Sequence, residues 1–145
     1  MGQDRRGGEQ MSVLGDFNTG VFSALSGSST LVTALGGTAI YYQIAPDKQS
    51  YPYVIFNWQS FMDENQTPSK MFDNILNVRV FASNPSQADT IIGTIDNLFD
   101  GHTLSVSGQT NFFSVRTMTF GDVFTDPSGI KTHVAGGLYR IRTGQ

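Results

Sequence analysis

One amphipathic stretch governs how this chain folds, and it reads Asn84-Pro85-Ser86-Gln87-Ala88-Asp89-Thr90-Ile91-Ile92-Gly93-Thr94-Ile95-Asp96-Asn97-Leu98-Phe99-Asp100-Gly101. Asn84 can cap a helix with its side-chain oxygen, and Pro85 suits the first helical position because its missing N–H would be unpaired there. Gln87 completes a capping-box spacing, and Gly101 can take the left-handed conformation that ends a helix. The apolar stripe has helical spacing and consists of Ala88, Ile91, Ile92, Ile95, Leu98 and Phe99. Such a helix needs an apolar surface, and the strands expected elsewhere predict that this surface is a sheet.

Most of the remaining segments predict strands. Residues 53–61 alternate in polarity, with Val54, Phe56 and Trp58 on one face, which is typical of a half-buried strand. Residues 75–82 alternate in the same way. Further strands are expected over residues 103–106, 112–120 and 131–142, with a short β-prone segment over 40–44 and a bulge or close approach at Gly136-Gly137.

Two short helices are expected ahead of these strands. Apolar residues recur with helical spacing from Asp16 to Gly27, and Ser28 or Ser29 can cap a second helix over residues 30–35. This order of elements predicts an α+β fold, in which a mainly antiparallel sheet of roughly four to six strands carries helices packed on one face.

The length of the chain bounds its domain organisation. With 145 residues it fits a single domain that is large enough for a hydrophobic core. Residues 1–15 are polar and glycine-rich, so we expect a disordered N-terminal segment there and one domain over residues 16–145. Residues 1–10 lack the apolar core of a secretory signal, and no apolar run approaches the roughly 20 residues that span a bilayer, so no membrane partner is expected.

Composition argues against several classes of function. Charged residues make up 14% of the chain and the net charge is −3, with no run of Lys or Arg. A sequence-independent grip on nucleic acid needs a basic stripe, so a nucleic-acid-binding protein is not expected. The absence of cysteine excludes disulfides and thiolate chemistry. A surface so poor in charge suits a chain that buries part of it in an assembly.

No motif for catalysis or for a cofactor is present. The only histidines are His102 and His133, and the spacings HExxH, GxSxG, GxGxxG and the Walker loop do not occur. Asp122 and Asp126 lie beside an Asp-Pro-Ser-Gly turn that could hold a divalent cation. The ligand spacing of calcium loops is missing, however, and a turn explains these residues more simply. The sequence therefore predicts no enzyme, no metal site and no cofactor.

Aromatic residues form a further candidate surface. They are Phe56, Trp58, Phe72, Phe112, Phe113 and Phe120. Stacking on nucleic-acid bases normally combines aromatic residues with Lys and Arg, which are not interleaved here, so core packing or a protein interface is favoured. If Phe112 and Phe113 both lie in a strand, they point to opposite faces. One of them then faces away from the helices, in a position that an oligomer would cover.

A pattern of apolar residues and turns runs through most of the chain. Its pieces are Val21-Phe22-Ser23-Ala24-Leu25, Leu31-Val32-Thr33-Ala34-Leu35-Gly36-Gly37, Ile40-Tyr41, Ala45-Pro46, Tyr51-Pro52-Tyr53-Val54, Asn77-Val78-Arg79-Val80-Phe81-Ala82, the helix over residues 86–99 and Gly137-Leu138-Tyr139-Arg140-Ile141-Arg142. Over roughly residues 15–142 this pattern resembles the tail-completion proteins of long-tailed phages. These are also called tail terminators or tail-to-head joining proteins, and gene transfer agents carry relatives. The Ala-Pro and Pro-Tyr-Val pieces are its most particular parts.

The resemblance implies a structural virion protein. It implies that the chain forms a homo-hexameric ring on the head-proximal end of the tail tube, stops tail polymerisation and offers a surface to the head connector. Its partners would then be itself, the tail tube protein and a head-connector or head-closure protein, first in the host cytoplasm during assembly and finally in the virion tail. DNA would pass through the lumen without specific binding, which a net negative subunit suits because a basic lumen would hold the phosphates.

Two predicted loops, residues 63–72 and 121–129, are long enough to reach a neighbour or the tube. We expect them to carry assembly contacts. Phe72 is the expected apolar anchor, and the expected polar contacts are Asp63, Glu64, Lys70, Asp122 and Asp126. Deleting residues 64–70 is then expected to leave the fold intact and to abolish ring formation or tube binding.

Two other interpretations stay open at this stage. The nearer one is a head-closure protein or another small neck protein, which the sequence hardly separates from a tail terminator. The more distant one is a cytosolic small-ligand-binding module or an enzyme, in which Asp63 and Glu64 would supply a carboxylate pair to a pocket. Specific thermal stabilisation by a metal or a nucleotide would favour that second interpretation.

Overall fold

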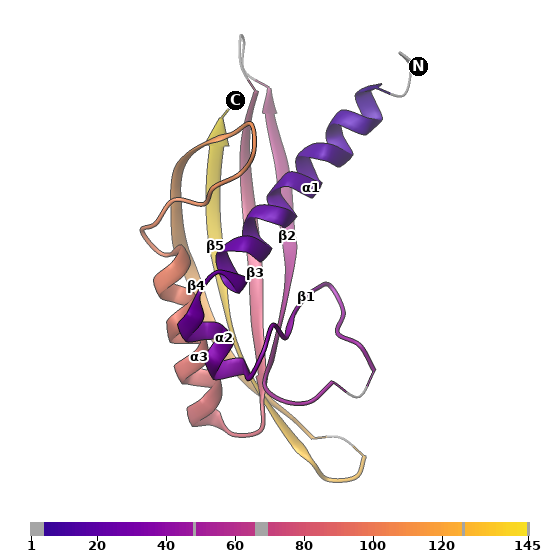
Figure 1. The fold of residues 1–145 in the computed structure, drawn as a ribbon, viewed down its shortest axis with the longest axis vertical. Coiled ribbons are helices and arrows are strands. Elements are labelled where there is room, and N and C mark those ends of the chain that lie inside the picture. Colours follow the sequence, from indigo (N-terminus) through magenta and orange to yellow (C-terminus); the bar gives the residue numbers. More distant parts are fainter. Residues whose placement is uncertain (1–4, 48, 66–69, 126, 145) are drawn as a thin grey trace.

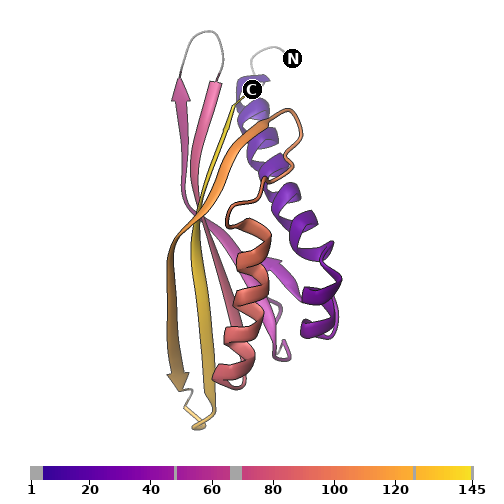
Figure 2. The same ribbon diagram turned by 90° about the vertical axis from the view of Figure 1, so that its left-hand side faces the viewer.

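A five-stranded sheet with helices on one side makes up the fold. The computed structural model describes residues 5–47, 49–65, 70–125 and 127–144, with only the backbone for residues 5–12, 63–65 and 70. The elements are α1 (Arg5–Ser26), α2 (Ser29–Leu35), β1 (Ile40–Tyr42), β2 (Tyr53–Asn65), β3 (Lys70–Ala82), α3 (Pro85–Phe99), β4 (Thr110–Thr125) and β5 (Lys131–Gly144). The strand order is β1-β2-β3-β5-β4, and only the β1–β2 pair is parallel. All three helices lie against the same face (Figures 1 and 2), which confirms the predicted α+β class.

Helix α3 begins and ends close to where the sequence predicts. The Oδ1 atom of Asn84 accepts a hydrogen bond from the Gln87 N–H at 2.8 Å, which is the first of the two bonds of a capping box. Gly101, in the left-handed region at φ 78°, follows the last turn. The residues of the stripe that the sheet buries are Ala88, Ile91, Ile95 and Phe99, with Ile92 and Leu98 at its margins.

The core lies between the helices and one face of the sheet. On β3, Leu76, Val78, Val80 and Ala82 are all 0% exposed, as the alternation predicts. The other large, fully buried side chains come from α1, α2, β2, α3 and β5, and include Phe17, Leu25, Leu31, Phe56, Phe99 and Tyr139. Of the two serines predicted as possible caps of α2, Ser28 is the one used, and its hydroxyl accepts a hydrogen bond from the Leu31 N–H at 3.2 Å.

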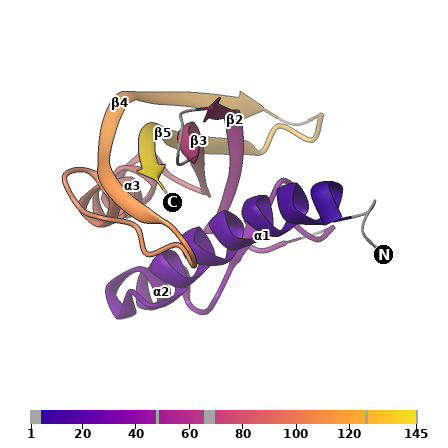
Figure 3. The same ribbon diagram turned by 90° about the horizontal axis from the view of Figure 1, so that it is seen from above.

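Helix α1 is longer than the sequence predicts. It begins at Arg5, so residues 5–15, which we expected to be disordered, are helical, and the boundary expected near residue 16 is not a boundary of secondary structure. The helix is longer because its second half packs on the core, where Phe17, Val21 and Leu25 are fully buried. Once these turns are nucleated by packing, each preceding residue adds a hydrogen bond at little further cost. The first turns of α1 run past the β2 side of the sheet (Figures 1 and 3).

Three other predictions of element bounds are wrong. Residues 103–106 form a loop rather than a strand, although Leu104 and Val106 are buried and gave the segment its strand-like alternation. Strand β4 continues to Thr125, so most of the predicted loop over 121–129 is strand. Strands β2 and β3 likewise extend over residues 63–65 and 70, which shortens the other predicted loop.

Candidate assembly surfaces

None of the described helices lies over one face of the sheet, and we call this face the uncovered face. On β3 it carries the residues that alternate with the core, namely Asp73, Ile75, Asn77, Arg79 and Phe81, and none of them is fully buried. The register adds apolar neighbours from the flanking strands, among them Ile55, Val115, Met118, Phe120, Val134 and Leu138. The face is therefore mixed, and exposed apolar side chains on a sheet face without a described second layer are typical of a surface that a partner covers.

A row of stacked aromatic rings crosses one end of the uncovered face. The ring of Tyr53 lies 4.9 Å from that of Phe81 and 5.6 Å from that of Tyr51, with both pairs nearly parallel. Burial raises the pKa of the Tyr53 phenol, and the nearby Tyr51 adds to the shift. At the same end of the face, Ile55 and Val134 are only 8% and 4% exposed, although no described helix covers them. The row is therefore a largely aromatic surface that is already present in the single chain.

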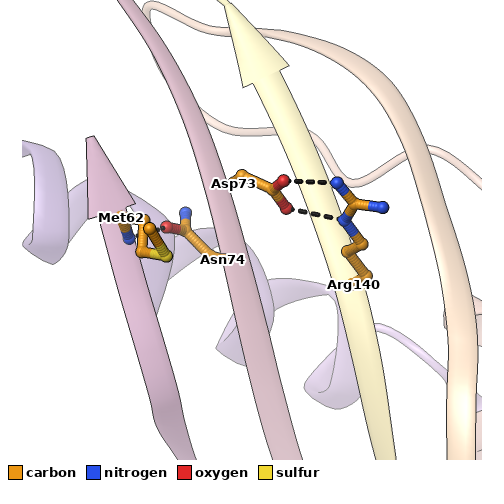
Figure 4. A network of polar contacts seen from close by, with 4 residues as sticks. All are labelled: Met62, Asp73, Asn74 and Arg140. Carbon is orange, nitrogen blue, oxygen red and sulfur yellow. Dashed lines mark hydrogen bonds and ion pairs between the residues drawn. The ribbon is translucent and has the colours of Figure 1, made fainter. Parts of the chain in front are cut away.

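An ion pair occupies the other end of the uncovered face (Figure 4). Arg140 of β5 donates from Nε to Asp73 Oδ1 at 2.8 Å and from Nη2 to Asp73 Oδ2 at 2.5 Å, across the β3–β5 pair. The guanidinium also lies 5.5 Å from the ring centroid of Phe113 on β4. Bidentate pairing and ring stacking together fix the orientation of Arg140. The hydrogen bond from Arg140 lowers the pKa of the Asp73 carboxyl, against a smaller opposing effect of its burial.

This ion pair predicts a component of acid sensitivity. Because the folded-state pKa of Asp73 is lowered, its contribution to the free energy of unfolding is present above the unfolded pKa of about 3.9 and is lost as the pH falls through the folded value. Asp73→Asn is expected to make unfolding less pH-dependent below about pH 4 in urea titrations at several pH values. Asp89→Asn, on the exposed side of α3, serves as the matched control. If the free energy of unfolding of Asp73→Asn fell with pH below about pH 4 as steeply as that of the unchanged chain, the prediction would be contradicted.

Exposed apolar side chains gather on the two outer strands. On β4 they are Phe112 at 52%, Met118 at 54%, Val123 at 48% and Phe124 at 55% exposed, and on β2 the corresponding residue is Met62 at 60%. The sequence contained part of this signal. The run Val123-Phe124-Thr125 is β-prone, but its position between Asp122 and Asp126 made a loop the simpler interpretation.

The described members of the two sets of predicted site residues lie at opposite ends of the sheet (Figure 1). Asp63 and Glu64 pair with Phe72 and Met71 at the β2–β3 end, where Lys70 also lies, but the side chains of Asp63, Glu64 and Lys70 are outside the described residues. At the other end Asp122 pairs with Val134 and is exposed, while Asp126 lies outside the described residues. A single chain therefore does not bring the two sets together.

Phe72 corrects the expectation of an apolar anchor. It is 5% exposed and packs in the core, with its ring 5.8 Å from that of Phe17 and 5.7 Å from that of Phe61. Its position in a strand opposite Asp63 turns the side chain toward the helices, because alternate residues of β3 face the core. Phe72 thus holds α1 on the sheet and offers no surface to a partner.

The described part of the chain holds no recognisable catalytic constellation. Among the described residues, no group of three or more His, Cys, Asp or Glu could hold a metal ion. A cavity of ≈ 410 Å³ lies between α1, the end of α3 and the loop after it. Its polar lining is mostly hydroxyl groups and consists of Asp16, Thr19, Ser23, Thr103, Ser105 and Ser107. A single carboxylate among hydroxyls supplies no acid–base pair.

In the described part of the chain, none of the helices is both long enough and apolar enough to span a lipid bilayer.

Comparison with known proteins finds a matching family model and solved structures with a similar fold. The model of the family described as "Tail completion protein gp17" matches residues 19–143. A chain in the solved structure "Virion of native gene transfer agent (GTA) particle" superposes with a TM-score of 0.74 at 16% identity, over 92% of this chain and 98% of that one. A second solved chain reaches a TM-score of only 0.45 at 12% identity, over 79% of this chain and 95% of that one, and carries no argument. No curated protein matches.

The two matches support different statements. At 16% identity the likeness to the gene transfer agent chain shows a shared fold and nothing more. The family match covers most of the chain, from the middle of α1 to the end of β5, and therefore includes every strand of the sheet. The chain accordingly belongs to the tail completion protein gp17 family and is a structural protein of a tail.

Proposed function

We propose that this chain closes the head-proximal end of a tail tube as a homo-hexameric ring. In this role it stops polymerisation of the tail tube protein and joins the tail to a head-connector or head-closure protein, while DNA passes through the lumen without specific binding. Assembly takes place in the host cytoplasm, and the finished ring is part of the virion. Membership of the tail completion family over residues 19–143 is the observation that carries the proposal.

The surface of the single chain supports an assembled state. Several large apolar side chains of β2 and β4 are about half exposed or more, and three of them, Met62, Met118 and Phe124, lie on the uncovered face, as expected of a surface that a partner covers. The overall net charge of −3 with 14% charged residues leaves few charges to be desolvated in a subunit contact. Heterologous contacts of this kind make closed rings when the rotation between subunits closes.

The two ends of the sheet supply separate binding sites for the two partners. Asp63, Glu64 and Lys70 lie in the strands at the β2–β3 end, and Asp122 lies at the β4–β5 end. A ring between a tube and a connector needs contacts on two opposite surfaces, and these positions meet that need. Phe72 belongs to the core, so the predicted residues that remain for these two sites are the polar ones.

Native mass by light scattering over a concentration series, followed by negative-stain imaging, tests the ring. A hexamer with a central hole, alone or after addition of purified tail tubes, is the expected result. A chain that stays monomeric with and without tubes would overturn the proposal. Binding to a connector or head-closure protein without any binding to tubes would instead favour a head-closure protein.

A charge-removal variant tests the contacts at the β2–β3 end. Because Glu64 and Lys70 lie in the strands, Asp63→Asn/Glu64→Gln/Lys70→Gln is a milder change than deletion of residues 64–70. It is expected to keep the melting temperature within a few degrees and to weaken tube binding in co-sedimentation by about tenfold, equivalent to about 1.4 kcal/mol. Asp89→Asn is the matched control. Equal binding by both variants would remove these residues from the proposed site.

A further inference from the structure

The two edges of the sheet run in opposite directions, which would allow antiparallel pairing between neighbouring copies. Strand β4 forms one edge, and β2 forms the other beyond the short β1. Successive pairs β2–β3, β3–β5 and β5–β4 are antiparallel, so β2 and β4 run in opposite directions. In a ring all copies have the same orientation about the axis. The β4 edge of one copy would therefore meet the β2 edge of the next as an antiparallel neighbour, and the alternation of strands would continue.

The first half of the β4 edge is closed within the chain. The carbonyl of Ser114 accepts a hydrogen bond from the Gly101 N–H at 2.7 Å. The N–H of Arg116 donates to Oδ1 of Asp100 at 2.9 Å. The turn after α3 therefore occupies the outward backbone groups at this level, and an incoming strand cannot pair there.

The second half of the β4 edge, Met118–Thr125, is open. Its other side pairs with β5 from Leu138 to Lys131. The Val123 N–H makes a local hydrogen bond to Oδ1 of Asp122 at 2.8 Å, and no described strand lies on the outer side of this segment. The segment contains no Lys and no Pro, the residues that usually protect an edge from pairing.

The β2 edge is open along its own second half. Strand β1 pairs only with Val54–Phe56, and the N–H of Gln43 then bonds to the carbonyl of Phe56 at 2.9 Å. Beyond this point no described strand lies on the outer side of residues 57–65. The part of this edge with described side chains, residues 57–62, contains no charged residue.

Both open segments expose apolar side chains at the same face. Met62 is 60% exposed on β2, and Met118 and Phe124 are 54% and 55% exposed on β4. The register places all three on the uncovered face, because they pair with Asp73, Leu138 and Thr132. Exposed methionine and phenylalanine beside an unpaired edge are costly in water and favourable at a contact between strands.

The open segments lie at opposite ends of the sheet. Residues 57–65 lie toward the β2–β3 end and Met118–Thr125 toward the β4–β5 end (Figure 1). Pairing them shifts each copy along the strand direction relative to the last. A sheet that closes into a barrel needs such a stagger because its strands tilt against the axis.

We propose that Met118–Thr125 of β4 in one copy pairs with residues 57–65 of β2 in the next copy, so that the ring is closed by one continuous antiparallel sheet. The partner is a second copy of this chain in a head-to-tail contact. This inference rests on the proposed ring. A two-fold β4–β4 contact would leave the β2 edge and Met62 in water, whereas the head-to-tail contact covers both edges.

Cysteine cross-linking of the full chain tests the contact, since the sequence has no native cysteine. The double variant Met62→Cys/Phe124→Cys is treated with a short bis-maleimide with and without tail tubes, and compared with each single variant by denaturing electrophoresis. The double variant is expected to give a ladder of covalent multimers up to the ring size. The single variants are expected to stay monomeric, because head-to-tail copies do not bring two identical residues together.

The outcomes separate this contact from the ring itself. A ring seen by light scattering without a ladder would overturn the strand pairing and leave the proposed function standing. A covalent dimer of the single variant Phe124→Cys would show a two-fold contact and overturn the head-to-tail arrangement. A chain that never assembles, with or without tubes, would overturn both proposals.

A second pair of variants needs no cross-linker. Met118→Lys and Phe124→Lys each place a charge on the open β4 edge, which discourages pairing. Each is expected to leave the melting temperature nearly unchanged, because the side chain is exposed, and to raise the concentration for half-assembly at least about tenfold. Phe22→Lys, at a 41% exposed position on α1, is the control and is expected to assemble normally. Normal assembly of both β4 variants would contradict the proposed edge.

Discussion

Replacing Phe17 with alanine is expected to lower the free energy of unfolding by about 3–5 kcal/mol, the range for a buried phenylalanine whose cavity cannot close. Phe17 is 0% exposed, and its ring lies 5.7 Å from Trp58, 5.1 Å from Phe61 and 5.8 Å from Phe72. These neighbours come from β2 and β3, so the ring packs α1 against both strands. Urea unfolding followed by circular dichroism measures the change.

Phe22→Ala is the matched control for this prediction. It removes the same ring from the same helix, but Phe22 is 41% exposed, so the loss is expected to stay below about 1 kcal/mol. Similar losses in the two variants would show that α1 is not docked through Phe17. Because Asn18 Oδ1 accepts from Trp58 Nε1 at 2.6 Å, loss of docking would also change the tryptophan fluorescence.

The sequence predicted α3 well because local signals and packing agree there. Its cap, its apolar stripe and its end are all encoded within residues 84–101, and the structure uses them for the same purposes. The same agreement holds for β3, because apolar and other residues alternate over residues 75–82 and only one face of the strand can then point to the core. Where neighbouring levels of structure agree, a single sequence carries enough information to place an element.

The wrong predictions for residues 5–15 and 103–106 share a physical cause, because tertiary contacts override the local conformational preference in both segments. Residues 5–15 have glycine and polar residues but continue a helix that Phe17 and Val21 fix to the core. Residues 103–106 alternate like a strand, but Leu104 and Val106 are buried from a loop that packs on α1 near Gly20. An added Cβ at Gly20 would lie 2.6 Å from the Ser105 carbonyl oxygen, so the backbones approach too closely for a side chain there.

The candidate surfaces were predictable only in part. The low content of charged residues pointed to an assembly, and the two predicted loops that contain Asp63 and Asp122 were the regions expected to carry its contacts. The Asp73–Arg140 pair and the position of Phe72 both depend on the register between β3 and its neighbours, which no local pattern specifies. The open edges depend on the strand order β1-β2-β3-β5-β4, in which β5 inserts between β3 and β4.

Gly137→Ala is expected to lower the free energy of unfolding by about 1–3 kcal/mol, the usual cost of overpacking a core. The added Cβ would lie 2.7 Å from the Tyr139 hydroxyl oxygen and 2.9 Å from two of its ring carbons. Tyr139 is 0% exposed and its ring lies 5.3 Å from that of Phe99 at the end of α3, so it has no free space to move into. Thermal and urea unfolding should both show the loss.

Gly136→Ala is the control, and it separates crowding from a general effect of alanine in β5. Its added Cβ would lie 2.2 Å from Cζ of Phe120, which is closer than the approach to Tyr139 at residue 137. Phe120, however, is only partly buried and stands on the uncovered face, so its ring can swing into solvent. Alanine also has less conformational freedom than glycine in the unfolded chain, which offsets part of the cost of moving the Phe120 ring. Gly136→Ala is therefore expected to be nearly neutral in the single chain, and equal losses at both positions would show that the buried Tyr139 ring is not what requires glycine at residue 137.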